Sequence, residues 1–158
     1  MKINIFTDGA CSKNPGPGGY GILMRAEETG LVKTFSKGFT LTTNNRMELL
    51  AVIVSLENLK SSGHEIHIHT DSRYVADAIN KGWLQNWQKR GFKNVKNPDL
   101  WKRLLPLLQL HSPTFHWIKG HSGHIENERC DALAVIAYKN GPLEIDEGFE
   151  NPDATTLF

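Results

Sequence analysis

The sequence has few cysteines and no long apolar run. Its only cysteines, Cys11 and Cys130, are too few for a disulfide framework and lack CxxC spacing. We therefore expect no disulfide partner and a location in the reducing cytoplasm. No apolar stretch approaches the roughly 20 residues that span a bilayer, and Asp8 interrupts the N-terminal apolar alternation in a way that does not suit a signal peptide. These absences exclude a disulfide-rich secreted protein and a membrane protein.

The chain also lacks a large net charge of either sign, but its charges are unevenly distributed. Its formal charge is +1. The segment 141–158 holds five acidic residues and no basic one, which leaves 12 acidic against 18 basic residues in the rest of the chain. The segment 81–103 holds seven basic residues against the single acid Asp99. A local basic field of this kind suits a polyanionic partner, although a solvated surface would explain it equally well.

The first third of the chain predicts a meander followed by a helix. Alternating apolar residues predict a strand that ends at Asp8, and after a turn rich in proline and glycine two further strands extend to about residue 40. Apolar residues at helical spacing then predict a well-buried helix from Asn44. Thr43 or Asn44 is the expected N-cap, and Gly63 is the expected stop.

The rest of the chain completes an α/β pattern. Its expected elements are a strand ending at Asp71, a helix through about Asn80, a helix over 99–108 that kinks or ends at Pro106, a strand over 114–119 and a helix from Ile125 to Lys139. This order predicts a five-stranded mixed sheet, an antiparallel meander plus parallel strands, flanked by helices. We expect one domain over 1–141. The acidic tail, 142–158, is not a separate domain and should be partly disordered or loosely packed.

Two aspartates stand where apolar strands are expected to stop, and this position suits a cation site. If the strands ending at Asp8 and Asp71 are adjacent and parallel, their Cα atoms lie roughly 5 Å apart. Two carboxylates at that separation repel each other, and a divalent cation would favour the arrangement. Glu48 and Asp131 lie early in predicted helices. Each acid alone could be a turn former, a cap or helix surface, and spacing does not establish that the four converge.

Five segments closely resemble the bacterial type 1 ribonucleases H, in register from about residue 3 to residue 140. They are FTDGACSKNPGPGGYG, TTNNRMELLAVI, HTDSRYV, WLQNWQKRGFK and KGHSGHIENERCDALA. The resemblance implies a ribonuclease H-like fold and an endoribonuclease that hydrolyses the RNA strand of RNA–DNA hybrids, leaving 5′-phosphate and 3′-hydroxyl ends. It also implies two Mg²⁺ ions, with Mn²⁺ as a substitute. The expected ligands are Asp8, Glu48, Asp71 and Asp131, with Asp8 bridging the two ions.

Several histidines and one glutamate have less direct interpretations. His121 matches the mobile-loop histidine of that family, and its ordinary pKa suits proton transfer at neutral pH. A zinc pair with His124, or a plain surface position, is the alternative. Glu128 is a weaker candidate for positioning the second ion. His67 and His69 alternate with isoleucines, so we interpret them as one face of a strand and not as ligands.

The resemblance also implies how a hybrid would be held. The backbone of Gly9 and Cys11 and the side chains of Asn14, Asn44 and Asn45 match contacts in the minor groove, where 2′-hydroxyls distinguish RNA from DNA. Thr43 and Asn97 match parts of a DNA-phosphate pocket. The segment Lys81–Lys96 resembles a basic protrusion that grips the DNA strand, and its expected contact residues are Trp83, Trp87, Lys89 and Arg90. Trp83 and Trp87 share a helical face and could stack on each other or on sugars. Trp101 and Trp117 are expected in the core.

Three departures from the familiar bacterial members accompany these matches. The protrusion is shorter between Lys93 and Pro98, so affinity should be weaker and more sensitive to salt. Leu41 stands where some members place an arginine in the phosphate pocket, and Arg73 replaces a glutamine.

The expected partner is an RNA–DNA hybrid, with no membrane, and the expected state is a monomer. Competing interpretations are a retroelement-derived nuclease domain attached to a polymerase, an inactive hybrid-binding module, and a general RNA-binding or antitoxin-like protein. The length of the chain and its start at Met1 argue against the first. Four intact carboxylates argue against the second, and the third would not require TDG and TDS where strands are expected to end.

Overall fold

A computed structural model of the protein describes residues 1–152 and contains one six-stranded mixed sheet. The spatial order of the strands is β5-β4-β1-β2-β3-β6. Their bounds are β1 (Lys2–Cys11), β2 (Gly16–Ala26), β3 (Val32–Thr42), β4 (Glu65–Thr70), β5 (Thr114–Trp117) and β6 (Leu143–Glu144). The β1, β2 and β3 strands form the predicted antiparallel meander, whereas β4 pairs parallel to β1, β5 to β4 and β6 to β3.

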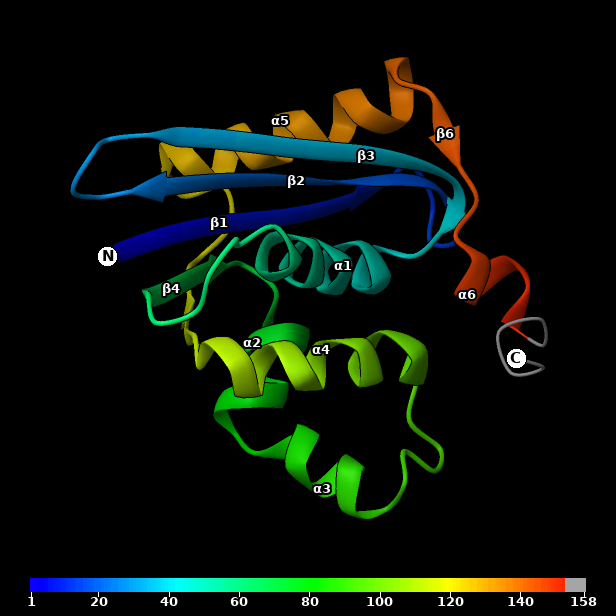
Figure 1. Ribbon diagram of the computed structural model, residues 1–158. Coiled ribbons are helices and arrows are strands. Elements are labelled where there is room, and N and C mark those ends of the chain that lie inside the picture. The colour runs from blue at the N-terminus through cyan, green and yellow to red at the C-terminus, as the bar shows by residue number, and fades with distance from the viewer. Residues whose placement is uncertain (153–158) are drawn as a thin grey trace.

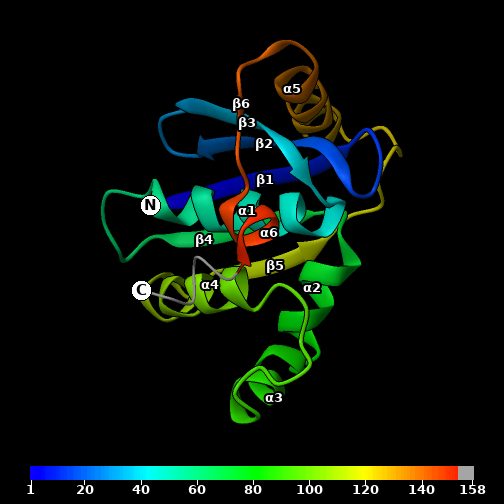
Figure 2. The same ribbon diagram turned by 90° about the vertical axis from the view of Figure 1, so that its right-hand side faces the viewer.

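Helices cover both faces of this sheet (Figures 1 and 2). They are α1 (Asn44–Glu57), α2 (Arg73–Asn80), α3 (Trp83–Lys89), α4 (Pro98–His111), α5 (Ile125–Asn140) and α6 (Glu147–Glu150). On one face α1 lies between the sheet and α4, and on the other face α5 packs against β1, β2 and β3. The predicted mixed sheet flanked by helices is thus confirmed. Among residues 1–152, no helix has the length and apolar character that crossing a membrane requires.

The central helix α1 is buried on nearly all sides. Ten of its 14 residues are buried, which agrees with the broad apolar pattern of its sequence. Its N-cap is Thr43, whose hydroxyl accepts a hydrogen bond from the backbone N–H of Arg46 at 3.2 Å. The helix ends at Glu57 and not near Gly63. Trp101 of α4, fully buried as predicted, belongs to the same core.

The other large helix, α5, approaches the sheet through glycines. A Cβ atom at Gly21 of β2 would overlap the carbonyl oxygen of Cys130, and one at Gly38 of β3 would overlap that of Ala137. Side chains at these positions would hold the helix away from the sheet. Their absence lets the α5 backbone lie directly on the β2 and β3 backbones.

The predicted number of strands, five, is wrong, because the C-terminal segment adds β6. This strand pairs with β3 over only two residues, Leu143 and Glu144, which is too short for a periodic pattern. Within this segment Asp146 is buried and contacts Arg46 and Thr42, whereas Leu143 and Ile145 are exposed. The end of the predicted tail, 153–158, lies outside the described residues.

Three further predictions about elements are wrong in detail. The first strand does not end at Asp8 but continues to Cys11, because β2 goes on pairing with it after β4 has stopped. Of the two alternatives for α4, a kink or an end at Pro106, the end is wrong, because the helix continues to His111; Pro106 is exposed, while the buried face of the helix packs on α1. Trp117 is not in the core, since it is 39% exposed at the end of the edge strand β5.

Candidate functional site

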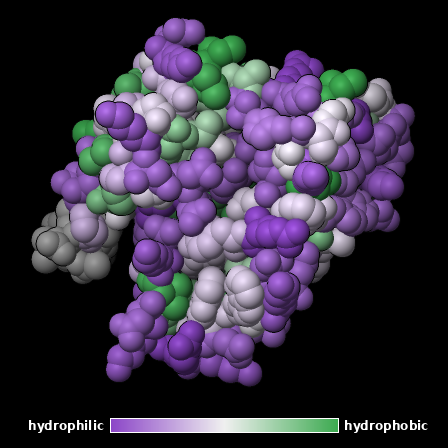
Figure 3. Space-filling model, turned by 180° about the vertical axis from the view of Figure 1, so that it is seen from behind, coloured by the Kyte–Doolittle hydropathy of each residue, from purple (hydrophilic) through white to green (hydrophobic). Residues whose placement is uncertain are grey.

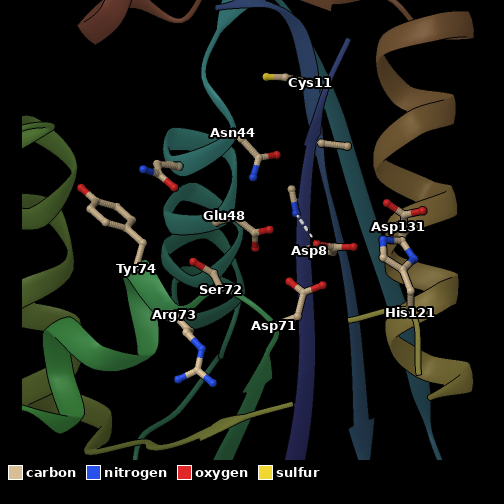
Figure 4. Close-up of a pocket in the computed structure, with 13 residues that line it drawn as sticks. Asp8, Cys11, Asn44, Glu48, Asp71, Ser72, Arg73, Tyr74, His121 and Asp131 are labelled. Carbon is tan, nitrogen blue, oxygen red and sulfur yellow. Dashed lines mark hydrogen bonds between the residues drawn. The ribbon is translucent and has the colours of Figure 1, made fainter. Parts of the chain in front are cut away.

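Three carboxylates meet where β4 ends beside β1. The parallel register pairs Thr7 with Thr70, so Asp8 and Asp71 come next to each other, and the condition stated for their closeness, adjacent parallel strands, is met. Helix α1 adds Glu48 from the other side. One carboxylate oxygen from each of the three residues lies within 4.8 Å of the others. The view in Figure 4 shows the three side chains converging from β1, α1 and the end of β4.

The close approach of Glu48 to Asp8 depends on Gly9. A Cβ atom at Gly9 would lie 2.5 Å from the backbone nitrogen of Glu48 and 2.7 Å from the carbonyl carbon of Met47. Only a residue without a side chain allows the α1 backbone to come this near to β1. The Gly9 backbone N–H also donates a hydrogen bond to Asp8 Oδ1 at 2.9 Å. The TDG sequence therefore sets the position of two carboxylates.

The fourth predicted carboxylate, Asp131, lines the same cavity but stands outside the tight group of three. It projects from α5, and Figure 4 shows it with His121 on the side of Asp8 away from Glu48. The cavity has a volume of about 450 Å³ and is open to solvent. It is lined by Asp8, Gly9, Ala10, Cys11, Asn44, Asn45, Glu48, Asp71, Ser72, Arg73, Tyr74, His121 and Asp131. His124 and Glu128 are not among these lining residues in the part of the chain that the structure describes.

Burial and mutual repulsion dominate the electrostatics of the cluster. Burial, followed by the charge of Asp71, raises the pKa of Asp8 to about 7. Burial and the charge of Asp8 raise the pKa of Glu48 well above its ordinary value. Glu48 Oε2 is buried and has no hydrogen-bond partner within residues 1–152. A buried carboxylate oxygen without a donor, beside two further carboxylates, fits a hard divalent cation such as Mg²⁺ or Mn²⁺.

This electrostatic cost predicts a pH-dependent effect of Asp8→Asn on the metal-free protein. The folded-state pKa of Asp8, about 7, lies above its ordinary value of 3.8. The stability from the protonated carboxyl is therefore complete below about pH 4 and is lost as the pH rises through 7. Asparagine carries no charge, so the variant should be more stable than wild type by roughly 2–4 kcal/mol at pH 8 and equal to it at pH 4.

Urea unfolding in EDTA between pH 4 and pH 8 measures this difference in stability. Asp77→Asn, on α2, is the matched control, and equal stabilities of Asp8→Asn and wild type at pH 8 would contradict the expectation.

The residues expected to contact the RNA strand gather at the rim of the cavity. Gly9, Cys11, Asn44 and Asn45 all line it. Asn14 lies in the turn between β1 and β2, and its Oδ1 accepts a hydrogen bond from the backbone N–H of Asn44 at 3.1 Å. This bond joins the glycine-rich turn to the start of α1, so the two predicted groups form one continuous surface.

The residues expected at a DNA-phosphate pocket also make contacts within the protein. Thr43 caps α1, as described above. Asn97 accepts a hydrogen bond from Arg46 Nη1 at 3.3 Å and donates one to the Tyr74 hydroxyl at 3.0 Å. Leu41 is 38% exposed, so the residue that replaces an arginine of the family places an apolar side chain on the surface.

The basic segment forms a projection beyond the sheet, built around α3 (Figures 1 and 2). Lys89 and Arg90 are exposed, and Trp83 is 41% exposed with Lys81 Nζ 5.6 Å from its ring centre. Trp87 instead packs edge-on against Trp101, with ring centres 5.4 Å apart. Within the described chain, the two tryptophans of α3 form no ring contact with each other. Trp83 is therefore the more available of the two.

Four cavity residues were not predicted as site residues, namely Ala10, Ser72, Arg73 and Tyr74. Trp117, predicted in the core, is associated with the same site: its Nε1–H donates a hydrogen bond to the carbonyl oxygen of Asp71 at 3.0 Å, and the Arg73 guanidinium lies 4.0 Å from its ring centre. The replacement of a family glutamine by Arg73 was the one sequence signal for this contact.

The face of the molecule opposite the view of Figure 1 is largely hydrophilic, with apolar side chains only in small separate groups (Figure 3).

Comparisons with known proteins agree on one family. The family model described as RNase H matches residues 1–139. Ribonuclease H of Desulforamulus reducens is 53% identical over 150 residues, covering 92% of each chain, and Ribonuclease HI of Synechocystis is 47% identical over 153 residues, covering 94% of each. Among solved structures, LC9-RNase H1, a type 1 RNase H with the type 2 active-site motif, is 28% identical, with a TM-score of 0.77 over 98% of this chain and 84% of that one. LC11-RNase H1 in complex with RNA/DNA hybrid is 26% identical, with a TM-score of 0.65 over 86% of this chain and 96% of that one.

Proposed function

Because the chain belongs to the RNase H family, we propose that it is a metal-dependent endoribonuclease that hydrolyses the RNA strand of RNA–DNA hybrids. The observation that carries this proposal is the group of three carboxylates within 4.8 Å of one another, at the floor of an open cavity. The solved complex of LC11-RNase H1 with RNA/DNA hybrid supports the choice of substrate.

Four carboxylates would hold the catalytic ions in this proposal. Asp8, Glu48 and Asp71 supply a compact set of oxygen donors, and Asp131 supplies a further donor from α5. Asp8 lies between Asp131 and Glu48 in Figure 4, so in this proposal it would be a ligand to both ions. Two Mg²⁺ ions, when bound, would lower the pKa of an attacking water and stabilise charge on the leaving oxygen. Departure of the 3′ oxygen would leave 3′-hydroxyl and 5′-phosphate ends.

His121 is proposed to move protons at the edge of the site. It lines the cavity on the Asp131 side, in the segment between β5 and α5, and it is exposed to solvent. An exposed imidazole at the edge of the cavity can accept a proton there and pass it to solvent.

Recognition of the two strands would be divided between two surfaces. The rim formed by Gly9, Cys11, Asn14, Asn44 and Asn45 offers backbone and amide groups, which suit the 2′-hydroxyls of RNA in a wide, shallow minor groove. The DNA strand would contact Thr43 and Asn97 and the exposed side chains of the α3 projection. The contact residues that we propose on the projection are Trp83, Trp87, Lys89 and Arg90.

A substrate panel tests this function. The protein is incubated with an RNA–DNA hybrid, an RNA duplex and a DNA duplex, each with Mg²⁺ or with EDTA. We expect cleavage of the RNA strand of the hybrid alone, with no cleavage in EDTA, because only the hybrid offers 2′-hydroxyls on one strand and the carboxylates need a cation. Cleavage of all three substrates, or full activity in EDTA, would refute the proposal. Light scattering during gel filtration tests the accompanying proposal of a monomer, and cell fractionation tests the cytoplasmic location.

A further inference from the structure

A second group of potential ligands lies on the sheet away from the carboxylates. The side chains of His67 and His69 on β4 and His116 on β5 share the face on which α5 packs against β1, β2 and β3. Their rings are stacked, with centres 5.0 Å apart between His67 and His116 and 4.9 Å apart between His69 and His116. All three side chains are partly exposed, so solutes reach them directly. The proposed function uses none of them.

Hydrogen bonds hold two of these imidazoles nitrogen to nitrogen. His67 Nδ1 and His116 Nε2 are 2.7 Å apart. His67 Nε2 is also 2.7 Å from Glu65 Oε2. An ionised carboxylate only accepts hydrogen bonds, so the Nε2 of His67 carries a proton, and in the neutral ring Nδ1 then presents a lone pair toward His116. Metal-binding histidines are oriented in this way, since their second nitrogen usually donates to a carboxylate.

We propose that His67 Nδ1 and His116 Nε2 bind a borderline divalent transition-metal ion, such as Zn²⁺ or Ni²⁺, with Glu65 supporting His67 from outside. Two nitrogens that each lie about 2.0–2.1 Å from one tetrahedral ion are roughly 3.3 Å apart. The present 2.7 Å separation thus needs to widen by about 0.6 Å, both rings need to turn their nitrogens toward one point beside the N–N line, and His116 would carry its proton on Nδ1 in place of Nε2. Water would complete the coordination. The interpretation of His67 and His69 as one strand face is confirmed, whereas the proposal departs from the expectation that neither is a ligand. The fold places His116 of β5 beside His67, a contact between segments far apart in the sequence.

Such an ion would stabilise the pairing of the edge strand β5 with β4. The β5 strand has four residues, and in the described chain β4 is its only neighbour in the sheet. An ion held by His67 and His116 would cross-link the two strands, so binding should raise the melting temperature. Imidazole nitrogens select borderline ions, whereas the carboxylate cluster selects Mg²⁺. The two sites should therefore be distinguishable by ligand chemistry.

The test is a titration of the full chain with Zn²⁺, in which calorimetry measures the heat of binding. Excess Mg²⁺ is present to occupy the carboxylates. An Asp8→Asn background repeats the titration with the carboxylate cluster impaired. We expect one Zn²⁺ per chain in both, with binding weakened at least about tenfold by His67→Gln or His116→Gln, and by about tenfold for Glu65→Gln. His64→Gln and His124→Gln are matched controls that should change nothing, and the second of them separates this site from a pair formed by His121 and His124.

A readout that does not depend on mutation accompanies the calorimetry. Nitrogen NMR of the histidine rings should show Zn²⁺-dependent shifts at Nδ1 of His67 and Nε2 of His116. Any of three results would overturn the proposal. They are absence of Zn²⁺ binding at about 100 times the concentration that saturates ordinary sites for one ion, an unchanged Zn²⁺ affinity in the His67→Gln/His116→Gln double variant, and NMR shifts confined to other histidines. Cleavage of the hybrid plays no part in these measurements, so failure here leaves the proposed function intact.

Discussion

Replacement of Asp8 by asparagine should lower Mg²⁺-dependent cleavage of the hybrid by about a thousandfold or more. Asparagine has the same shape but no charge, and it would occupy the position between Glu48 and Asp131 that we assign to the shared ligand. Losing a bound cation removes several kcal/mol of transition-state stabilisation, and each 1.36 kcal/mol changes the rate about tenfold. Single-turnover cleavage of a labelled hybrid at saturating protein measures the chemical step.

Two comparisons keep this result specific. Asp77→Asn should cleave at the wild-type rate, because Asp77 lies on α2 and pairs with Lys81 outside the cavity. The Asp8→Asn variant should still bind the hybrid, as measured by fluorescence anisotropy, since the proposed strand contacts are made by the rim and the α3 projection. Retention of more than about a tenth of the wild-type rate would remove Asp8 from the centre of the mechanism.

Arg46→Met should destabilise the protein by about 3–5 kcal/mol, the cost of leaving a buried charge without its partner. The Arg46 side chain is almost fully buried and donates to Asp146 at 2.8 and 2.9 Å and to Asp99 at 2.7 and 2.9 Å. Asp146 is also buried, and its remaining partner is the Thr42 hydroxyl, which donates to it at 2.7 Å. Burial acts to raise the pKa of Asp99, but the hydrogen bonds from Arg46 outweigh it and lower that pKa. Urea unfolding at pH 7 measures the effect.

An exposed arginine provides the control for this change. Arg103 also makes two hydrogen bonds to one carboxylate, that of Glu57, but both side chains are substantially exposed. Arg103→Met should therefore cost no more than about 1 kcal/mol. Adding Asp146→Asn to Arg46→Met should recover part of the lost stability, because it removes the unpaired charge. A loss below about 1 kcal/mol for Arg46→Met would show that the buried network contributes little.

The sequence predicted the central sheet and its helices because those elements carry regular apolar patterns. It placed Asp8 and Asp71 close together only on the condition that their strands are adjacent and parallel, and the pairing of β1 with β4 meets that condition. The reasoning was wrong about one step, because β1 continues beyond Asp8 on its β2 side. The order of strands in a sheet depends on pairings between distant segments, and local periodicity does not report them.

Two of the missed features depend on contacts between segments far apart in the chain. Arg46 lies in the RMEL segment, but its partner Asp146 is 100 residues away in a segment without periodicity. Trp117 is an aromatic residue in an apolar context, for which burial is the usual expectation. Its exposure follows from its place at the end of an edge strand. The positions of Glu48 and Asp131 relative to the aspartates were implied by family resemblance and not by spacing.

The glycines beneath α5 restrict how far the carboxylate of Asp131 can shift relative to the sheet. Asp131 directly follows Cys130, whose carbonyl oxygen would collide with any side chain at Gly21. The backbone of that turn of α5 thus contacts the β2 backbone directly, with no side chain between them that could change its rotamer. Flexible side chains between a helix and a sheet would permit sliding and tilting, whereas direct contact between backbones permits neither without loss of the contact. The position of Asp131 at the cavity therefore depends on β2. It is set by the lack of a side chain at Gly21 and not by a group on α5 itself.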